Sequence, residues 1–314
     1  MLNTERIIIM KRLENVTLIG MGALGTLFAT ILLESLPPES VTFLMDPERY
    51  AKYHARPVLV NGTPVSFNMV TPDQAKPADL VIVSTKATGL PEALNTLETS
   101  VGPDTIIISA INGVTSEEIL SRRFGRDKVI HAVAQGMDAA YFSGKLTYRM
   151  KGCFCIGITD PSMQEKLDAL TDFFDRTHFP YKVEDDILHR IWSKFMLNVG
   201  INQVCMVCET GYGGATRPES FELMLMVSAM REAKLIALAE GINLTEEDLT
   251  GYVDLMRSLT PDSMPSMAQD RIRKKPSEVE IFSGTVRAIA EKHGFLVPVN
   301  DYLYNKVKEI EAAY

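Results

Sequence analysis

A glycine-rich turn near the start of the chain constrains its fold more than any other feature. Residues 15–34 read NVTLIGMGALGTLFATILLE: a short β-branched run, a turn with three glycines, and then an apolar helical pattern. This is the dinucleotide-binding fingerprint in its strand–turn–helix context, with the pyrophosphate on the positive end of the helix dipole. Gly20 allows the tight turn, Gly22 allows close backbone approach to the pyrophosphate, and Gly25 allows close helix–strand packing. The predicted cofactor-binding segment is Gly20, Met21, Gly22, Ala23, Leu24 and Gly25.

The remaining pattern predicts two domains. Short apolar runs at 16–19, 41–45, 79–85, 105–110 and 129–134 alternate with helical stretches, as in a parallel sheet buried on both faces. A hairpin is expected over 57–70 with its turn at Asn61-Gly62, a return strand over 148–158, and a helix from Asp160 to about His178. From residue 184 onward the patterns are helical, at 187–208, 218–240, 246–257, 278–293 and 299–313. We therefore predict an α/β Rossmann-type dinucleotide-binding domain over 1–184, followed by an all-helical domain over 185–314. The interdomain cleft is the expected place for a substrate.

Charge and hydropathy restrict the partners. The net charge of −8 argues against nucleic-acid and anionic-membrane partners. No apolar run reaches the roughly 18 residues that span a bilayer. The apolar residues 7–10 are too few for a signal-peptide core, so 1–15 is interpreted as a loose leader and the location as cytoplasmic. The apolar segment 224–230 suits either the core or the interface of a homodimer.

The four cysteines occur as two close pairs. Cys205 and Cys208 have the spacing of half a zinc site or of a redox motif. Both lie in apolar sequence, where reduced cysteine packs as a small hydrophobe, and no His/Cys cluster completes a four-ligand set. The buried, unmodified interpretation is preferred, and no metal is expected.

The predicted helix over 187–208 is apolar on nearly all sides, which indicates burial. It nevertheless carries Lys194, Asn198 and Asn202, spaced four apart and therefore on one face. An ammonium and two amides are costly to bury without partners. Either Lys194 reaches solvent and the asparagines bond backbone groups, or the strip faces the cleft and a ligand is the missing partner. A partly desolvated lysine, with its pKa lowered, could protonate a ketone oxygen that receives a hydride.

Two polar segments follow predicted strands at the edge where open α/β sheets bind ligands. Lys86 follows the run 79–85, and Asn112-Gly113 follows the run 105–110. Each alone is a weak signal, because a strand-end Asn-Gly is often only a turn.

Taken together, these residues resemble the ketopantoate reductases (2-dehydropantoate 2-reductases). The resemblance runs through the fingerprint, Lys86, Asn112-Gly113 and the spacing Lys194-x3-Asn198-x3-Asn202. It continues in SMAQD at 266–270 and SEVE at 277–280, which are close to the family's Ser-Met-x-Gln-Asp and Thr-Glu-Ile-Asp pieces. It covers essentially the whole chain after the leader.

The resemblance implies reduction of 2-dehydropantoate to pantoate in pantothenate biosynthesis. Lys194 would be the general acid, and Glu278 would bind and orient the substrate. Ser266 would hold the substrate carboxylate, and Asn198 and Asn202 its distal hydroxyl. Asn112 and Lys86 would lie where cofactor and substrate meet. Without the resemblance, Ser266 reads as a helix cap and Glu278 as a first-turn residue.

Two departures from the family pattern leave alternatives open. Family members that use NADPH carry an arginine at the end of the second strand, whereas this chain has Asp46, which is typical of NADH enzymes, with Arg49 three residues on. Ser263 stands where the family has a substrate-contacting asparagine. The resemblance therefore implies a reductase of 2-dehydropantoate or of another 2-oxo acid, using NADPH or NADH. A nucleotide sensor without turnover is the alternative from another class.

Overall fold

The computed structural model describes residues 12–314, so residues 1–11 of the leader predicted over 1–15 lie outside the described part. The chain forms two compact units. The first runs to Ile111 and continues from Thr115 to Ile187, and the second combines Asn112–Val114 with Leu188–Tyr314. The sequence predicted a boundary between 184 and 185. It did not predict that the three residues Asn112–Val114 belong with the helical unit.

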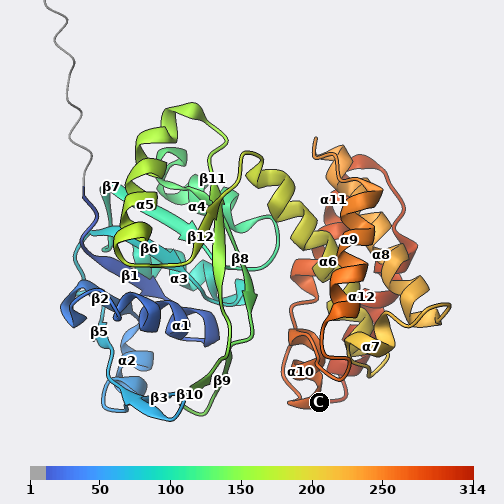
Figure 1. The fold of residues 1–314 in the computed structure, drawn as a ribbon, viewed down its shortest axis with the longest axis horizontal. Coiled ribbons are helices and arrows are strands. Elements are labelled where there is room, and N and C mark those ends of the chain that lie inside the picture. Colours follow the sequence, from blue (N-terminus) through green and yellow to red (C-terminus); the bar gives the residue numbers. More distant parts are fainter. Residues whose placement is uncertain (1–11) are drawn as a thin grey trace, which may run out of the picture. The chain divides into compact units, whose positions relative to one another are not determined.

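A five-stranded parallel sheet forms the centre of the first unit (Figure 1). Its strand order is β5-β2-β1-β6-β7, and all four pairings are parallel. The strands are β1 (Val16–Ile19), β2 (Val41–Leu44), β5 (Asn68–Val70), β6 (Ala78–Val83) and β7 (Val101–Ser109). The helices between them are α1 (Ala23–Leu32), α2 (Pro47–Tyr53) and α3 (Leu90–Leu97), and α4 (Ser116–Phe124) follows β7. Continuous apolar runs such as β1, buried at every residue, are expected for strands covered on both faces.

Two smaller sheets complete this unit. One has the order β4-β3-β10-β9 and the other β12-β11-β8. The strands are β3 (Val58–Val60), β4 (Thr63–Val65), β8 (His131–Met137), β9 (Ala140–Phe142), β10 (Lys145–Thr147), β11 (Lys151–Gly157) and β12 (Tyr181–Val183), and α5 is Gln164–Arg176. The predicted return strand is β11, which pairs antiparallel with β8.

The hairpin prediction was right at its turn and wrong at its end. β3 and β4 pair antiparallel around Asn61 and Gly62, whose φ values of 46° and 88° suit an Asn-Gly hairpin turn. The last residues of the predicted hairpin form β5 instead, parallel to β2 at the edge of the main sheet. Met69 packs on one core cluster of the unit and Val70 on the other, so successive residues serve the two faces of that sheet.

The second unit is helical, as predicted. Its helices are α6 (Ile187–Val207), α7 (Tyr212–Ala215), α8 (Phe221–Ala239), α9 (Glu246–Ser258), α10 (Ser266–Ile272), α11 (Thr285–His293) and α12 (Pro298–Glu311). The sequence did not predict the short helices α7 and α10. Between residues 12 and 314, no helix has both the length and the apolar character needed to cross a membrane.

The helix predicted over 278–293 is irregular at its start. Residues Glu280–Gly284 form a π-helical turn, with Gly284 N–H donating to the Val279 carbonyl at 2.9 Å, and regular helix begins only at Thr285. The three consecutive residues Ile281, Phe282 and Ser283 are all buried.

Candidate active site

The fingerprint turn has the geometry that its glycines predict. Gly20 has φ = 102°, and a Cβ added there would lie 2.6 Å from the backbone of Ser84 and Thr85. A Cβ on Gly25 would lie 2.0 Å from the Gly20 carbonyl oxygen, so the helix approaches the strand as closely as glycine permits. Nothing lies within 4 Å of the corresponding position at Gly22. Ser84, which follows β6, donates its hydroxyl to the Gly20 carbonyl at 2.9 Å and ties the turn to the sheet.

The start of α1 fits an anionic group. No side chain caps this helix, and no acidic residue lies in its first turn. The first N–H groups of a helix lack partners within it, and they carry the positive end of the dipole. Met21, Ala23 and Leu24 lie in this segment together with the open position at Gly22. The turn can therefore hold the pyrophosphate of a dinucleotide.

The carboxyl end of β2 carries a small charge cluster. Asp46 caps α2, because its Oδ1 accepts the Arg49 N–H at 2.8 Å. The Arg49 guanidinium lies 3.3 Å from Asp46 Oδ2 and 3.4 Å from Glu92 Oε2. Two carboxylates thus face one arginine. Lys86, the other cofactor residue predicted in this unit, is exposed and begins a short 3₁₀ turn after β6.

In the helical unit, α6 is buried almost throughout. From 191 to 206 every residue of the helix is buried except Lys194 and Asn198. Asn202, four residues further on, is 5% exposed. Within 191–206, Lys194 and Asn198 of the predicted polar strip are thus the partly exposed positions, and Asn202 is buried.

Lys194, Asn112 and Glu278 form one hydrogen-bonded chain. Lys194 Nζ donates to Asn112 Oδ1 at 3.2 Å, and Asn112 Nδ2 donates to Glu278 Oε2 at 3.1 Å. The three residues come from α6, from the segment that follows β7, and from the residue two before the π-helical turn. Since an ammonium can only donate and a carboxylate only accept, the orientation of the Asn112 amide is fixed.

Asn198, Asn202 and Ser266 form a second hydrogen-bonded set. Asn202 Nδ2 donates to Asn198 Oδ1 at 3.2 Å. Asn202 Oδ1 accepts from the Ser266 hydroxyl at 3.0 Å and from the Met267 N–H at 3.3 Å. Pro265, which precedes α10, gives that helix no side-chain cap. Asn202 therefore caps α10 from another helix.

The polar strip has partners within the protein. Lys194, Asn198 and Asn202 all bond side chains or backbone groups of the helical unit, and together these residues form a polar array. A ligand bound at this strip stays a prediction.

Two contributors to this array were not predicted. Gly113 has φ = 103°, and a Cβ there would lie 2.6 Å from Ile281 Cγ2, so only glycine lets the Asn112 segment approach the π-helical turn this closely. The other contributor is the Met267 backbone N–H. The Asn-Gly pair was a readable signal for the first, but a backbone donor has no signature in the sequence.

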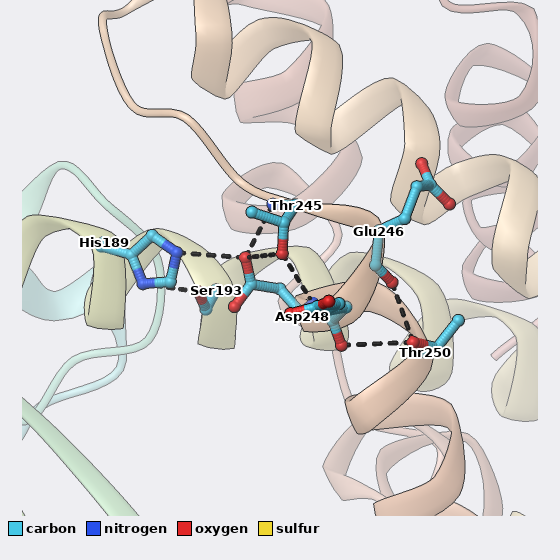
Figure 2. Close-up of polar contacts among 7 residues, drawn as sticks. His189, Ser193, Thr245, Glu246, Asp248 and Thr250 are labelled. Atoms are coloured by element: carbon cyan, nitrogen blue, oxygen red, sulfur yellow. Dashed lines mark hydrogen bonds and ion pairs between the residues drawn. The ribbon is translucent and has the colours of Figure 1, made fainter.

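The N-terminal part of α6 is anchored to α9 (Figure 2). His189 Nε2 lies 3.1 Å from Asp248 Oδ2, and that oxygen also accepts from the Thr245 N–H at 2.7 Å. Thr245 and Asp248 form a capping box at the start of α9, where the sequence predicts a capped helix. Ser193 lies 3.4 Å from His189 Nδ1, which resembles a Ser–His–Asp arrangement, but Ser193 is 2% exposed and no substrate can reach it. The cluster holds the helix that carries Lys194.

Cys205 and Cys208 lie at the end of α6, and Cys205 is fully buried. Burial raises the pKa of Cys205 to about 12, and burial also raises the pKa of Cys208. The thiolate is the reactive form in disulfide exchange, so burial disfavours that reaction at both thiols; that they serve only for packing stays a prediction.

Fold and site together define a class of protein, the NAD(P)-dependent oxidoreductases with a Rossmann-type domain and a helical domain. Residues 16–152 match the family described as ketopantoate reductase PanE/ApbA, and residues 186–311 match its C-terminal domain. The chain belongs to the ketopantoate reductase family.

Individual relatives are distant but cover nearly the whole chain. A 2-dehydropantoate 2-reductase of Vibrio cholerae is 24% identical over 300 residues, which is 96% of this chain and 99% of the relative. Among solved structures, a D-mandelate dehydrogenase with NADH and anilino(oxo)acetate superposes with a TM-score of 0.84 at 20% identity, covering 95% of this chain and 98% of the other. A ketopantoate reductase from Staphylococcus aureus, described as dimeric, has a TM-score of 0.78 at 21% identity, covering 95% and 99%. At 20–21% identity, the likeness to these solved structures shows the fold alone.

Proposed function

We propose that this protein reduces 2-dehydropantoate to pantoate with a reduced nicotinamide dinucleotide. The bound dinucleotide supplies the hydride for the ketone carbon. The observation that carries the proposal is the hydrogen-bonded chain from Lys194 through Asn112 to Glu278, which fixes one ammonium group at a partly open position on a buried helix. Family membership and the curated relatives support the choice of substrate.

Lys194, Asn112 and Glu278 each have a role in this mechanism that follows from their hydrogen bonds. Lys194 Nζ donates the proton that the ketone oxygen gains as charge develops on it. Asn112 Oδ1 accepts from the same nitrogen and so restricts its direction. Glu278 fixes the Asn112 amide, and its carboxylate can also accept from a substrate hydroxyl. The fingerprint turn and the start of α1 hold the pyrophosphate.

We infer that NADH is preferred over NADPH. Asp46 stands at the end of β2, where an acidic residue bonds the ribose hydroxyls and repels a 2′-phosphate. Arg49, the residue that could receive that phosphate, is already paired with Asp46 and Glu92. A phosphate would have to displace two carboxylates. We expect kcat/KM for NADH to exceed that for NADPH by at least about tenfold, and Asp46→Ala to reduce the ratio. An equal or reversed ratio in the wild type would contradict the inference.

A second candidate is reduction of a 2-oxo acid with a different side chain. Ser263 stands where the family has an asparagine, and it is exposed. Its backbone carbonyl accepts a hydrogen bond from the Tyr212 N–H at 3.0 Å. The structural relative that binds anilino(oxo)acetate shows that this fold also serves an aromatic 2-oxo acid analogue. A panel of 2-oxo acids with hydroxylated, branched and aromatic side chains separates the two candidates.

The proposed chemistry is tested by steady-state kinetics with 2-dehydropantoate and both reduced nicotinamides. Loss of a general acid typically costs about 10²–10⁴ in rate, so Lys194→Ala should lower kcat by at least about 100-fold. The matched control is Lys234→Ala, which removes a lysine of α8 that pairs with Glu246 and should leave kcat within about twofold. An unchanged kcat in Lys194→Ala refutes the mechanism, and a wild type without turnover of 2-dehydropantoate refutes the substrate.

We also propose a homodimer. In the segment 224–230, predicted for either the core or an interface, Met226 is buried and Met224 is 60% exposed. Phe221 and Leu238 of the same helix are 55% and 59% exposed, and the Staphylococcus aureus relative is described as dimeric. Light scattering after size-exclusion chromatography should give twice the chain mass, and a monomer at micromolar concentration would refute the dimer.

A further inference from the structure

A buried hydrogen-bonded network joins three elements of the helical unit. Its members are Gln203 on α6, Ser283 in the π-helical turn and Asn300 on α12, and all three are fully buried. The Ser283 hydroxyl lies 2.5 Å from Gln203 Oε1 and 2.8 Å from Asn300 Oδ1. A buried network of this kind can impose one particular arrangement on the elements that it joins.

Both amides of this network are held with their oxygen toward Ser283. Gln203 Nε2 donates to the Val199 carbonyl at 2.6 Å, so its NH₂ end is already used on α6. Asn300 Nδ2 donates to Glu232 Oε2 at 2.8 Å, which uses its NH₂ end on α8. Ser283 is therefore the donor, and its single proton bonds to α6 or to α12. One hydroxyl group thus ties the π-helical turn to two helices.

The π-helical turn also contacts the Asn112 segment at two points. Glu278, just before the turn, accepts from Asn112 Nδ2 at 3.1 Å, and the Glu278 carbonyl accepts from the Ile281 N–H at 3.0 Å. Ile281 is also the residue that a Cβ on Gly113 would meet at 2.6 Å. Asn112 Oδ1 in turn accepts from Lys194 Nζ at 3.2 Å. A displacement of the turn therefore moves the amide oxygen that receives the Lys194 ammonium.

Two connections therefore join this part of the chain to α6. One runs from Glu278 through Asn112 to Lys194, and the other runs directly from Ser283 to Gln203. Lys194 and Gln203 are nine residues apart. That separation is about two and a half helical turns, so the two side chains lie on opposite sides of α6 and about 13.5 Å apart along its axis. Attachment at two separated points restricts the turn in direction as well as in distance, whereas a single attachment leaves it free to pivot.

We propose that Ser283 is a positioning residue for the proton donor. Its hydroxyl fixes the π-helical turn against α6, the turn fixes Asn112, and Asn112 restricts the direction of the Lys194 ammonium. Ser283 is fully buried, so no substrate can meet it and its effect passes through the residues that it holds. The inference rests on the proposed function, in which Lys194 protonates the ketone oxygen.

The test measures kcat with 2-dehydropantoate and a reduced nicotinamide in Ser283→Ala and in Gln203→Met, which remove the donor and the acceptor of one bond. Each variant should lower kcat about tenfold, since a misplacement of about 1 Å can cost up to about 10² in rate. The double variant should be within about twofold of the slower single variant, because both changes break the same bond. The matched control is Thr177→Val in the first unit, which removes a buried hydroxyl that donates to the Phe173 carbonyl at 2.8 Å and should leave kcat within about twofold.

An Asn112→Ala background distinguishes positioning from a general structural effect. There Ser283→Ala should change kcat by less than about twofold, because the path from Ser283 to Lys194 is already broken. A tenfold fall in that background overturns the inference, and so does a kcat within twofold of the wild type in Ser283→Ala alone.

A second measurement separates the inference from the proposed function. Absence of turnover of 2-dehydropantoate by the wild type refutes the proposed substrate, and NMR of the protein labelled with ¹⁵N-asparagine then decides the inference. The side-chain amide signal of Asn112, identified by its loss in Asn112→Ala, should shift in Ser283→Ala and stay in place in Thr177→Val. An unshifted signal in Ser283→Ala overturns the inference.

Discussion

Glu117 offers a test of how burial of a carboxyl group controls stability. It lies in the first turn of α4 and is 5% exposed. Burial raises its pKa from 4.5 to about 7, although hydrogen bonds from Ser116 and from backbone groups oppose the rise. Because the folded protein holds this proton more tightly than the unfolded chain, the group favours folding below pH 4.5. That advantage is lost as the pH rises to about 7.

The magnitude follows from the pKa difference. At 1.36 kcal/mol per pKa unit, a rise from 4.5 to about 7 corresponds to roughly 3 kcal/mol. Glu117→Gln removes the ionisation and keeps an oxygen for the Ser116 hydroxyl, which donates to Glu117 at 2.8 Å. The free energy of unfolding of the variant, relative to the wild type, should therefore increase by roughly 3 kcal/mol between pH 4.5 and pH 8.

The assay is urea denaturation of both proteins across that pH range. The comparison uses the change with pH, so any constant cost of the amide cancels. Glu165→Gln, which removes a carboxylate from an exposed first-turn position of α5, is the matched control. Parallel curves for Glu117→Gln and the wild type, within about 0.5 kcal/mol, would refute the reasoning.

Three further predictions concern single contacts. Thr245→Ala removes the side-chain half of the capping box on α9 and should lower the free energy of unfolding by about 1 kcal/mol in urea denaturation, with no loss counting against the cap. Gly25→Ala forces a Cβ to 2.0 Å from a carbonyl oxygen and should lower the melting temperature by several degrees. Gly22→Ala should leave the melting temperature within about 2 °C and weaken NADH binding in a fluorescence titration. Similar melting temperatures for the two variants would contradict this prediction. Gly113→Ala puts a Cβ 2.6 Å from Ile281 at a positive φ, so kcat should fall at least about tenfold as Asn112 is displaced, and an unchanged kcat would show that this approach is not needed.

The local elements were predictable because their signals are local. The three fingerprint glycines lie within six residues, and the turn has the geometry their spacing predicts. The Asn61-Gly62 turn and the Thr245 capping box are likewise written in a few adjacent residues. The polar strip on α6 could be read because a fixed helical repeat turns a spacing of four into a shared face.

The partners across the fold were beyond reach of the same reasoning. Nothing in the sequence pairs residue 112 with 278, or 202 with 267, because distance along the chain carries no record of distance in space. The sequence pattern predicts a regular helix over 278–293, and it gave no sign of the π-helical turn at Glu280–Gly284.

By itself, the sequence determined which residues could carry polar chemistry: a lysine and two asparagines on an apolar helix, and glycines where a phosphate can approach. Only the tertiary structure decided which way their hydrogen bonds run. A side-chain amide can face either direction until a group that can only donate or only accept is placed beside it. Here the Met267 N–H fixes one set and the Lys194 ammonium the other, and both arrive from distant parts of the chain.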